Sequence, residues 1–132
     1  MPLVQFDIIE GRSKEEIKKI LDITHKSIVS SFEVPISDKY QVVNIRKPEE
    51  MIIEDTGLGF KRDSSFVLIS VLSSKRSKDK KIKFYKSVVT NLNAEMGISK
   101  ENIMINITEN LPEDWSFGMG EVQFINGKLS IT

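Results

Sequence analysis

The apolar positions in the first 46 residues predict a strand, a helix and a second strand. An apolar run over residues 2–8 is typical of a strand. Ser13 with Glu16 three residues later forms a capping box, which predicts the start of a helix that ends before Pro35. One face of this helix carries Ile17, Ile20, Leu21, Thr24 and Ile28. Residues 40–46 predict a second strand. Because a helix connects the two strands, we expect them to be parallel.

The second half of the chain repeats this order. Residues 66–72 form a nearly continuous apolar run, as a buried parallel strand does. A helix is predicted from Ser77 to a stop at Gly97, and residues 102–108 predict the closing strand. The inward face of this helix carries Ile82, Tyr85, Val88, Val89 and Leu92. The chain therefore contains two strand-helix-strand units.

A short sequence match at the same point of both units indicates a tandem duplication. Arg12-Ser13-Lys14 recurs as Arg76-Ser77-Lys78, 64 residues later (76 minus 12). We therefore expect a single domain over residues 1–132, with units at about 2–46 and 66–108.

Two fused units of this kind predict an α/β (α+β) fold with a four-stranded mixed sheet and two helices on one face. The other face of the sheet then lacks cover, so we expect subunits to pack sheet inward as a closed ring. Near the C-terminal end, a strand at 122–125, the turn Asn126-Gly127 and a last short strand predict a hairpin.

Composition narrows the classes of function. The 19 basic and 19 acidic residues balance, so nothing favours nucleic acid or an anionic membrane as a partner. The absence of cysteine excludes disulfides and thiol nucleophiles, and the one histidine gives no metal-ligand spacing. The longest apolar run, Phe66 to Val71, is too short to span a bilayer, and no signal peptide opens the chain. We expect a cytoplasmic protein without a metal.

The candidate chemistry begins at Pro2. The residue after Met1 is a small proline, so we expect initiator removal to leave Pro2 as a free secondary amine. An α-amino group titrates at roughly 7.7–8.0, so it can exchange a proton near neutrality. Such an amine can serve as a base, an acid or an iminium former. The alternative is an ordinary chain start, since many chains begin with Met-Pro.

An N-terminal proline on a strand and a duplicated strand-helix-strand unit resemble the tautomerase superfamily, and within it the malonate semialdehyde decarboxylases most closely. The resemblance runs from Pro2 to about Leu129. It is carried by Phe6-Asp7-Ile8-Ile9-Glu10-Gly11-Arg12, Val34-Pro35, Asp38, Tyr40-Gln41, Glu54-Asp55-Thr56-Gly57-Leu58-Gly59, Arg76-Ser77, Phe84-Tyr85-Lys86, Gly97-Ile98-Ser99 and Asp114-Trp115-Ser116-Phe117-Gly118.

This resemblance implies a homotrimer with three sites, each centred on Pro2, and no metal or organic cofactor. It implies a small keto or aldehyde carboxylate as the substrate. The residues it implies as catalytic are Pro2, Asp38 and Arg76, and those it implies as substrate-binding are Ser74, Trp115, Phe117 and Phe124. Ser74 departs from the pattern, because the decarboxylases have the first of two arginines at that position.

The reaction implied is decarboxylation of a small β-keto or aldehyde acid of the malonate semialdehyde type, in which a cationic Pro2 polarises the carbonyl. A neutral Pro2 would instead abstract an α-proton, as in an enol–keto tautomerase of a 2-keto acid such as phenylpyruvate. A third alternative is a non-catalytic trimer that binds a partner protein.

Each candidate residue also has an ordinary structural interpretation. Arg76 could be a solvated arginine at a helix start, and Asp38 a turn residue. Trp115 and Phe117, two positions apart on an extended segment, could be core. His25, at the edge of the first helix's apolar face, is expected to be a packed or surface histidine. Continued strand alternation past position 74 would place Ser74 and Arg76 on the same side, with Lys75 pointing away.

Overall fold

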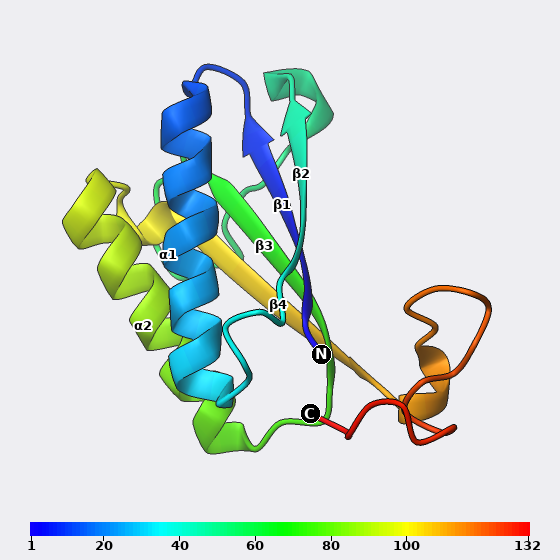
Figure 1. Ribbon diagram of the computed structural model, residues 1–132. Helices are drawn as coiled ribbons and strands as arrows, with labels where there is room; N and C mark the ends of the chain where they lie inside the picture. Colours follow the sequence, from blue (N-terminus) through cyan, green and yellow to red (C-terminus); the bar gives the residue numbers. More distant parts are fainter.

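Four strands form one mixed sheet in the order β2-β1-β3-β4, and two helices cover one of its faces (Figure 1). The structure is a computed structural model that describes residues 1–132. Its main elements are β1 (Leu3–Ile9), α1 (Lys14–Phe32), β2 (Tyr40–Arg46), β3 (Val67–Ser74), α2 (Lys78–Met96) and β4 (Ile103–Asn110). β1 pairs with β2 and β3 pairs with β4, both in parallel, whereas β1 and β3 are antiparallel. The predicted architecture is confirmed, with strand ends displaced by one or two residues.

The duplication is visible in the element boundaries. Both helices have 19 residues, and their first residues, 14 and 78, are separated by the same 64 positions as the repeated tripeptide. Ser13 and Ser77 cap the two helices, each accepting a hydrogen bond from the backbone N–H three residues later, at 3.1 and 3.2 Å. The capping box predicted at Ser13 and Glu16 is present. Both helices therefore begin in the same way, after a serine whose hydroxyl accepts from the backbone N–H three residues later.

The core lies between the sheet and the helices. Alternate residues of β1 and β3 point toward the helices and are almost completely buried, as the period of a strand requires. From the helices, Phe32 and Phe84 meet with their ring centroids 5.3 Å apart. The Ser27 and Ser87 hydroxyls join α1 and α2 at 3.0 Å. Neither helix carries an apolar stretch able to cross a membrane.

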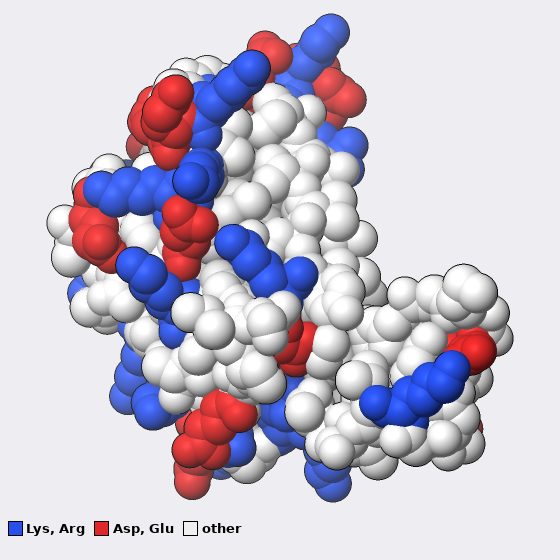
Figure 2. Space-filling model, in the orientation of Figure 1, with Lys and Arg blue, Asp and Glu red and all other residues white.

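The other face of the sheet has no cover within the protomer, as predicted. Val42, Leu72 and Met104, from three different strands, remain 43%, 37% and 40% exposed. In Figure 2 the helices present most of the charged side chains, and the side along β2 is largely uncharged. Between these apolar residues the face carries uncharged polar ones such as Ser70 and Asn106. A weakly charged sheet face with exposed apolar side chains is typical of a surface that packs against another subunit.

The predicted C-terminal hairpin is wrong. No strand follows β4, and the chain instead forms consecutive turns that project as a separate lobe (Figure 1). The carbonyl of Val122 accepts from the N–H groups of both Ile125 and Asn126, at 3.0 and 2.9 Å. This carbonyl is therefore used in a tight turn, and one bond from the Leu129 N–H to the Gln123 carbonyl, at 3.1 Å, remains across the segment.

The packing predicts a large effect for truncation of Phe84. This ring is fully buried between the helices, so Phe84→Ala is expected to lower the free energy of unfolding by about 3–5 kcal/mol. Ile82→Ala, on the partly exposed side of the same helix, is expected to cost less than about 1 kcal/mol. Denaturant unfolding of both variants provides the measurement. Equal losses would contradict the core described above.

Candidate active site

Three chain segments meet at the start of β1 because of the sheet topology. Leu3 is paired with Leu72 near the end of antiparallel β3, and with Tyr40 at the start of parallel β2. The residue before β1, the link after β3 and the turn before β2 therefore lie at one end of the sheet. These segments carry Pro2, Ser74 with Arg76, and Asp38. The three residues predicted as catalytic thus belong to adjoining segments.

The N-terminal amine at this end is partly buried and surrounded by charge. It belongs to Met1 in this structure, and it donates to the backbone oxygen and hydroxyl of Thr132 at 2.9 and 3.3 Å. Burial and the charge of Arg76 lower the pKa of this amine to about 6, while the charge of Asp38 opposes the shift. An amine with this pKa is mostly unprotonated at pH 7. Pro2 itself is buried directly beside it.

Arg76 is fixed by contacts on several sides. Its Nε donates to the Ser73 hydroxyl at 3.1 Å, and its Nη2 donates to the Thr132 backbone oxygen at 2.9 Å. The guanidinium lies 5.2 Å from the centroid of the Phe32 ring, within cation–π range. These contacts leave Nη1 and one Nη2 hydrogen for a ligand, which suits end-on binding of a carboxylate.

The strand alternation considered past Ser74 is not found. β3 ends at Ser74, and the Arg76 side chain turns back to Ser73. Its backbone N–H donates to a Glu109 carboxylate oxygen at 2.6 Å, which fixes the link after the strand. Alternation therefore does not place Ser74 and Arg76 on the same side. Lys75 is exposed.

Asp38 is a buried carboxyl group without a hydrogen-bond partner. It ends a turn in which its backbone N–H donates to the Pro35 carbonyl at 3.0 Å. The residue is 6% exposed, and both side-chain oxygens are buried and unpaired. Burial raises the pKa of Asp38, against the lowering charges of the N-terminal amine, Arg76 and His25. Unsatisfied buried groups are costly and rare, so Asp38 is a candidate for proton transfer or for holding a ligand.

Ser74, like Asp38, has a buried polar side chain without a hydrogen-bond partner, but its hydroxyl is uncharged. It is 5% exposed, and its hydroxyl is buried without a partner. The carbonyl of Ser74 accepts from the Ser73 hydroxyl at 2.8 Å. This bond orients the Ser73 oxygen so that it can accept from Arg76.

The predicted aromatic residues form one cluster beside this end of the sheet. Trp115 and Phe117 are stacked with centroids 5.4 Å apart and an angle of 10° between the rings. Phe124 meets Phe117 edge-on at 5.3 Å. Tyr40 completes the cluster at 5.7 Å from Phe117, and it is the member that the sequence did not identify. Because Tyr40 is paired with Leu3, the cluster adjoins the N-terminal end of β1.

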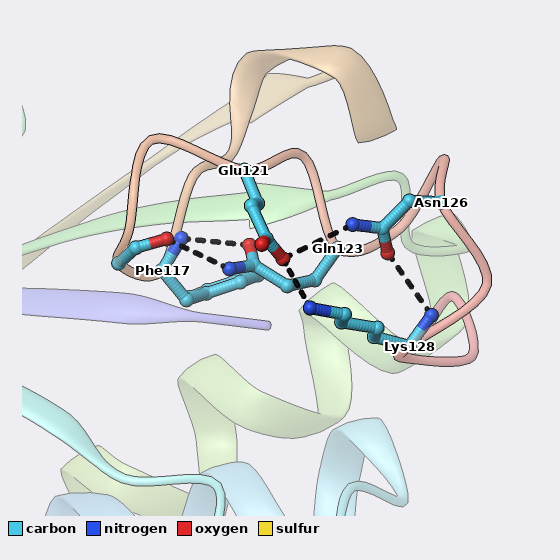
Figure 3. A network of polar contacts seen from close by, with 6 residues as sticks. Phe117, Glu121, Gln123, Asn126 and Lys128 are labelled. Atoms are coloured by element: carbon cyan, nitrogen blue, oxygen red, sulfur yellow. Dashed lines mark hydrogen bonds and ion pairs between the residues drawn. The ribbon is translucent and has the colours of Figure 1, made fainter.

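The lobe that carries this cluster is held by its own polar contacts (Figure 3). The Phe117 N–H donates to the Gln123 side-chain oxygen at 3.0 Å, and the Gln123 amide donates to the Gly118 carbonyl at 3.0 Å. Lys128 pairs with Glu121 at 2.5 Å. The indole N–H of Trp115 donates to Asn110 at 2.7 Å, which ties the lobe to the end of β4.

The opposite end of the sheet, which the duplication relates to the site, has only one of the three groups found at the site. At an offset of 64, Arg12 corresponds to Arg76, but Phe66 stands in place of Pro2 and Asn102 in place of Asp38. Arg12 donates to the Ser65 carbonyl at 2.6 Å, much as Arg76 donates to Thr132. A hollow of about 350 Å³ lies beside Arg12. The other end therefore keeps the arginine without the amine and the carboxyl group.

No group of three or more His, Cys, Asp or Glu side chains is arranged to hold a metal ion. Arg76 contacts Phe32 and Thr132, which are distant from it in the sequence, and Ser73, which lies three residues before it. The sequence did not identify these three residues, because the contacts arise only from the packing of α1, β3 and the chain end.

The fold and site define an α/β protein built from two crossover units, with an arginine and a buried carboxyl group beside its N-terminal amine. A family model described as "Tautomerase enzyme" matches residues 38–118, and a second family model with the same description matches residues 2–61. It is 48% identical to "Probable tautomerase YrdN" of Bacillus subtilis (strain 168), covering 98% of this chain and all of that protein. It is 31% identical to "Probable tautomerase YusQ" of the same organism, covering 95% and 99%. The chain belongs to the tautomerase family, whose members are enzymes.

Solved structures agree with this assignment. A malonate semialdehyde decarboxylase superposes with a TM-score of 0.92 at 42% identity, covering 96% of this chain and 98% of that one. The malonate semialdehyde decarboxylase FG41, inhibited by 3-bromopropiolate, gives a TM-score of 0.93 at 35% identity, covering 98% and 99%. A fused 4-OT symmetric trimer shares the fold at 14% identity, with a TM-score of 0.77 and coverage of 95% and 98%.

The charges at the site predict the direction in which two substitutions move the pKa of the N-terminal amine. Arg76→Ala is expected to raise it, because the guanidinium charge disfavours the ammonium form. Asp38→Asn is expected to lower it, because the carboxylate favours the ammonium form. An NMR titration of the isotopically labelled amine measures both shifts. Lys75→Ala, which removes an exposed charge nearby, is the control and should move the pKa less; shifts of the opposite sign would refute the electrostatic description.

Proposed function

We propose that this protein decarboxylates a small β-keto or aldehyde acid of the malonate semialdehyde type, with the amine of Pro2 as the catalytic group after removal of Met1. The observation that carries this proposal is the convergence of three groups at one end of β1: the N-terminal amine, Arg76 and the unpaired carboxyl group of Asp38. The similarity to two malonate semialdehyde decarboxylases over nearly the whole chain supports it.

Arg76 binds the substrate carboxylate in this mechanism. Its guanidinium is oriented by Ser73 and Phe32, and its free hydrogens suit a carboxylate. Bound in this way, the substrate presents its carbonyl to the amine. The ammonium of Pro2 then polarises the carbonyl oxygen as the carbon–carbon bond to the carboxylate breaks, and the electron pair of that bond forms an enolate. Carbon dioxide leaves, and the enolate carbon takes up a proton. In this mechanism Asp38 relays that proton from solvent to the enolate carbon.

The substrate itself favours the protonated amine. With Met1 in place, burial and then the positive charge of Arg76 lower the pKa of the N-terminal amine to about 6, and the Pro2 amine adjoins the same charge. A carboxylate bound to Arg76 offsets that charge, so the amine pKa rises when the substrate is present. The cationic form needed for decarboxylation is therefore favoured in the complex more than in the free enzyme.

A second candidate function is enol–keto tautomerisation of a 2-keto acid such as phenylpyruvate. The lowered pKa of the N-terminal amine favours it, because a neutral amine can abstract an α-proton. Ser74 in place of an arginine also leaves less positive charge near the scissile carboxylate than two arginines would provide. The two candidates use the same groups in different protonation states.

The pH dependence of two reactions distinguishes these candidates. A panel of keto and aldehyde acids is assayed for both carbon dioxide release and α-proton exchange, with the protein's mass confirming the loss of Met1. Under the proposal, kcat/KM for carbon dioxide release falls as the pH rises through the amine pKa, because the ammonium form is lost. Proton exchange that rises over the same range, without carbon dioxide release, would instead establish the tautomerase. Protein that retains Met1 serves as the control and should be inactive.

Arg76 is expected to carry most of the carboxylate recognition, because Ser74 offers only a neutral hydroxyl. Charge-assisted hydrogen bonds contribute roughly 1.5–3 kcal/mol each. Arg76→Ala should therefore lower kcat/KM about 100-fold, since about 2.7 kcal/mol corresponds to two decades. Ser74→Arg supplies the first of the two arginines that the resemblance to the decarboxylases implies, so it should increase the decarboxylation of malonate semialdehyde. Full activity of Arg76→Ala on every acid of the panel would exclude this carboxylate site.

We also propose that the protein is a homotrimer assembled through the uncovered sheet face. The partly exposed Val42, Leu72 and Met104 support this arrangement, and burying them stabilises the assembly by the hydrophobic effect. Native mass spectrometry at micromolar concentration should report trimers, and Leu72→Lys should shift them toward monomers. Ile82→Lys, on the helical side, is the matched control. Monomers alone from the unmodified protein would contradict the trimer.

A further inference from the structure

One histidine ties the turn that carries Asp38 to α1. His25 lies on α1 and is 8% exposed, and its Nε2 is 2.7 Å from the carbonyl oxygen of Ile36. A carbonyl oxygen only accepts hydrogen bonds, so Nε2 carries the hydrogen in this contact. The packed histidine expected from the sequence is therefore found, and it has a specific partner two residues before Asp38.

The other hydrogen bonds of this turn are internal. The Asp38 N–H donates to the Pro35 carbonyl at 3.0 Å, and the Lys39 N–H donates to the Ser37 carbonyl at 2.9 Å. These bonds fix the shape of the turn but not its position relative to α1. The side chain of Ile36 is 74% exposed, so it does not anchor the turn by packing.

Two further contacts lie on either side of the turn. Val34 is buried and fixes the start of the connection. The ion pair of Lys39 with Asp22 spans 3.7 Å between side chains that are 46% and 44% exposed, and such a surface pair contributes little. The bond from His25 is therefore the main buried polar contact that positions the middle of the turn.

The position of Asp38 matters because its carboxyl group acts over short distances. Its two oxygens have no partner in the protein, and their charge acts on the N-terminal amine and on Arg76. A displacement of about 1 Å at a reacting group can lower a rate about 100-fold. A group that fixes the turn would therefore affect the chemical step without touching the substrate.

We propose that His25 is a positioning residue, which holds Asp38 toward the N-terminal amine by donating its Nε2 hydrogen to the Ile36 carbonyl. This inference rests on the proposed function for its kinetic consequence. The hydrogen bonds that fix Arg76 go to Glu109, Ser73 and Thr132 rather than to this turn, so His25 is expected to affect kcat more than KM.

Two substitutions at position 25 separate hydrogen bonding from packing. His25→Leu removes the donor, whereas His25→Gln places an amide N–H at a similar reach. We expect His25→Leu to lower kcat 10- to 100-fold with KM within about twofold, and His25→Gln to recover most of the loss. If His25→Leu does not fold, His25→Met, which is more adaptable in shape, replaces it as the variant without a donor.

A neighbouring buried residue provides the matched control. The Thr24 hydroxyl donates to the Ile20 carbonyl at 2.8 Å, within the same helix and away from the turn. Thr24→Val should therefore leave kcat unchanged even where it changes the unfolding midpoint. In an Asp38→Asn background, His25→Leu should cause little further loss of kcat, because both changes act through one group.

A second measurement does not depend on turnover. Asp38 raises the pKa of the N-terminal amine, so displacing its carboxyl group in His25→Leu should lower that pKa, while His25→Gln should leave it unchanged. If the amine pKa moves in this way but no acid of the panel reacts, the positioning role stands and the proposed function fails. The inference is overturned if His25→Leu retains both kcat and the amine pKa, or if His25→Gln is as impaired as His25→Leu.

Discussion

The antiparallel pairing of β1 with β3 is the constraint on which the site depends. Each crossover unit alone is parallel, and joining the two units through their first strands brings the start of one to the end of the other. The amine before β1 thus lies beside the link that carries Arg76, although the two are far apart in the sequence. The same pairing creates an equivalent end at Arg12. Only one of the two ends has a chain terminus beside it, and this makes the ends chemically different.

Burial then determines the chemistry of these groups. The amine, Asp38 and Arg76 are each partly removed from water, and in each case desolvation is the largest cause of the pKa shift. Desolvation favours the neutral forms, while the mutual charges favour or oppose the ionised ones. A ligand carboxylate enters this balance as one more charge. The site is therefore best understood as a set of coupled charges whose protonation depends on what is bound.

Local sequence signals predicted the elements well. The helix start at Ser13, the stop at Gly97 and the strand over 40–46 all follow from capping, glycine and apolar period, and the structure has them. The hairpin after residue 122 failed because residues 122–126 form a tight turn instead of an extended strand. At the site, the sequence identified Pro2, Asp38 and Arg76 through resemblance. It did not identify Phe32 or Tyr40, whose roles come from contacts between distant segments, or Ser73, whose contact with Arg76 arises because the chain turns back after β3.

The turn before β2 illustrates why the sequence alone does not predict contacts of this kind. Asp38 follows a proline and precedes a strand, a position at which an aspartate needs no special explanation. Only the packing shows that its carboxyl group lacks a partner and that the carbonyl of Ile36, two residues earlier, accepts a hydrogen bond from His25. The folded chain accepts the cost of an unpaired carboxyl group because Val34, His25 and the strand hold the backbone around it. An unpaired buried group persists where the surrounding structure is rigid, and it is then free to act on a ligand.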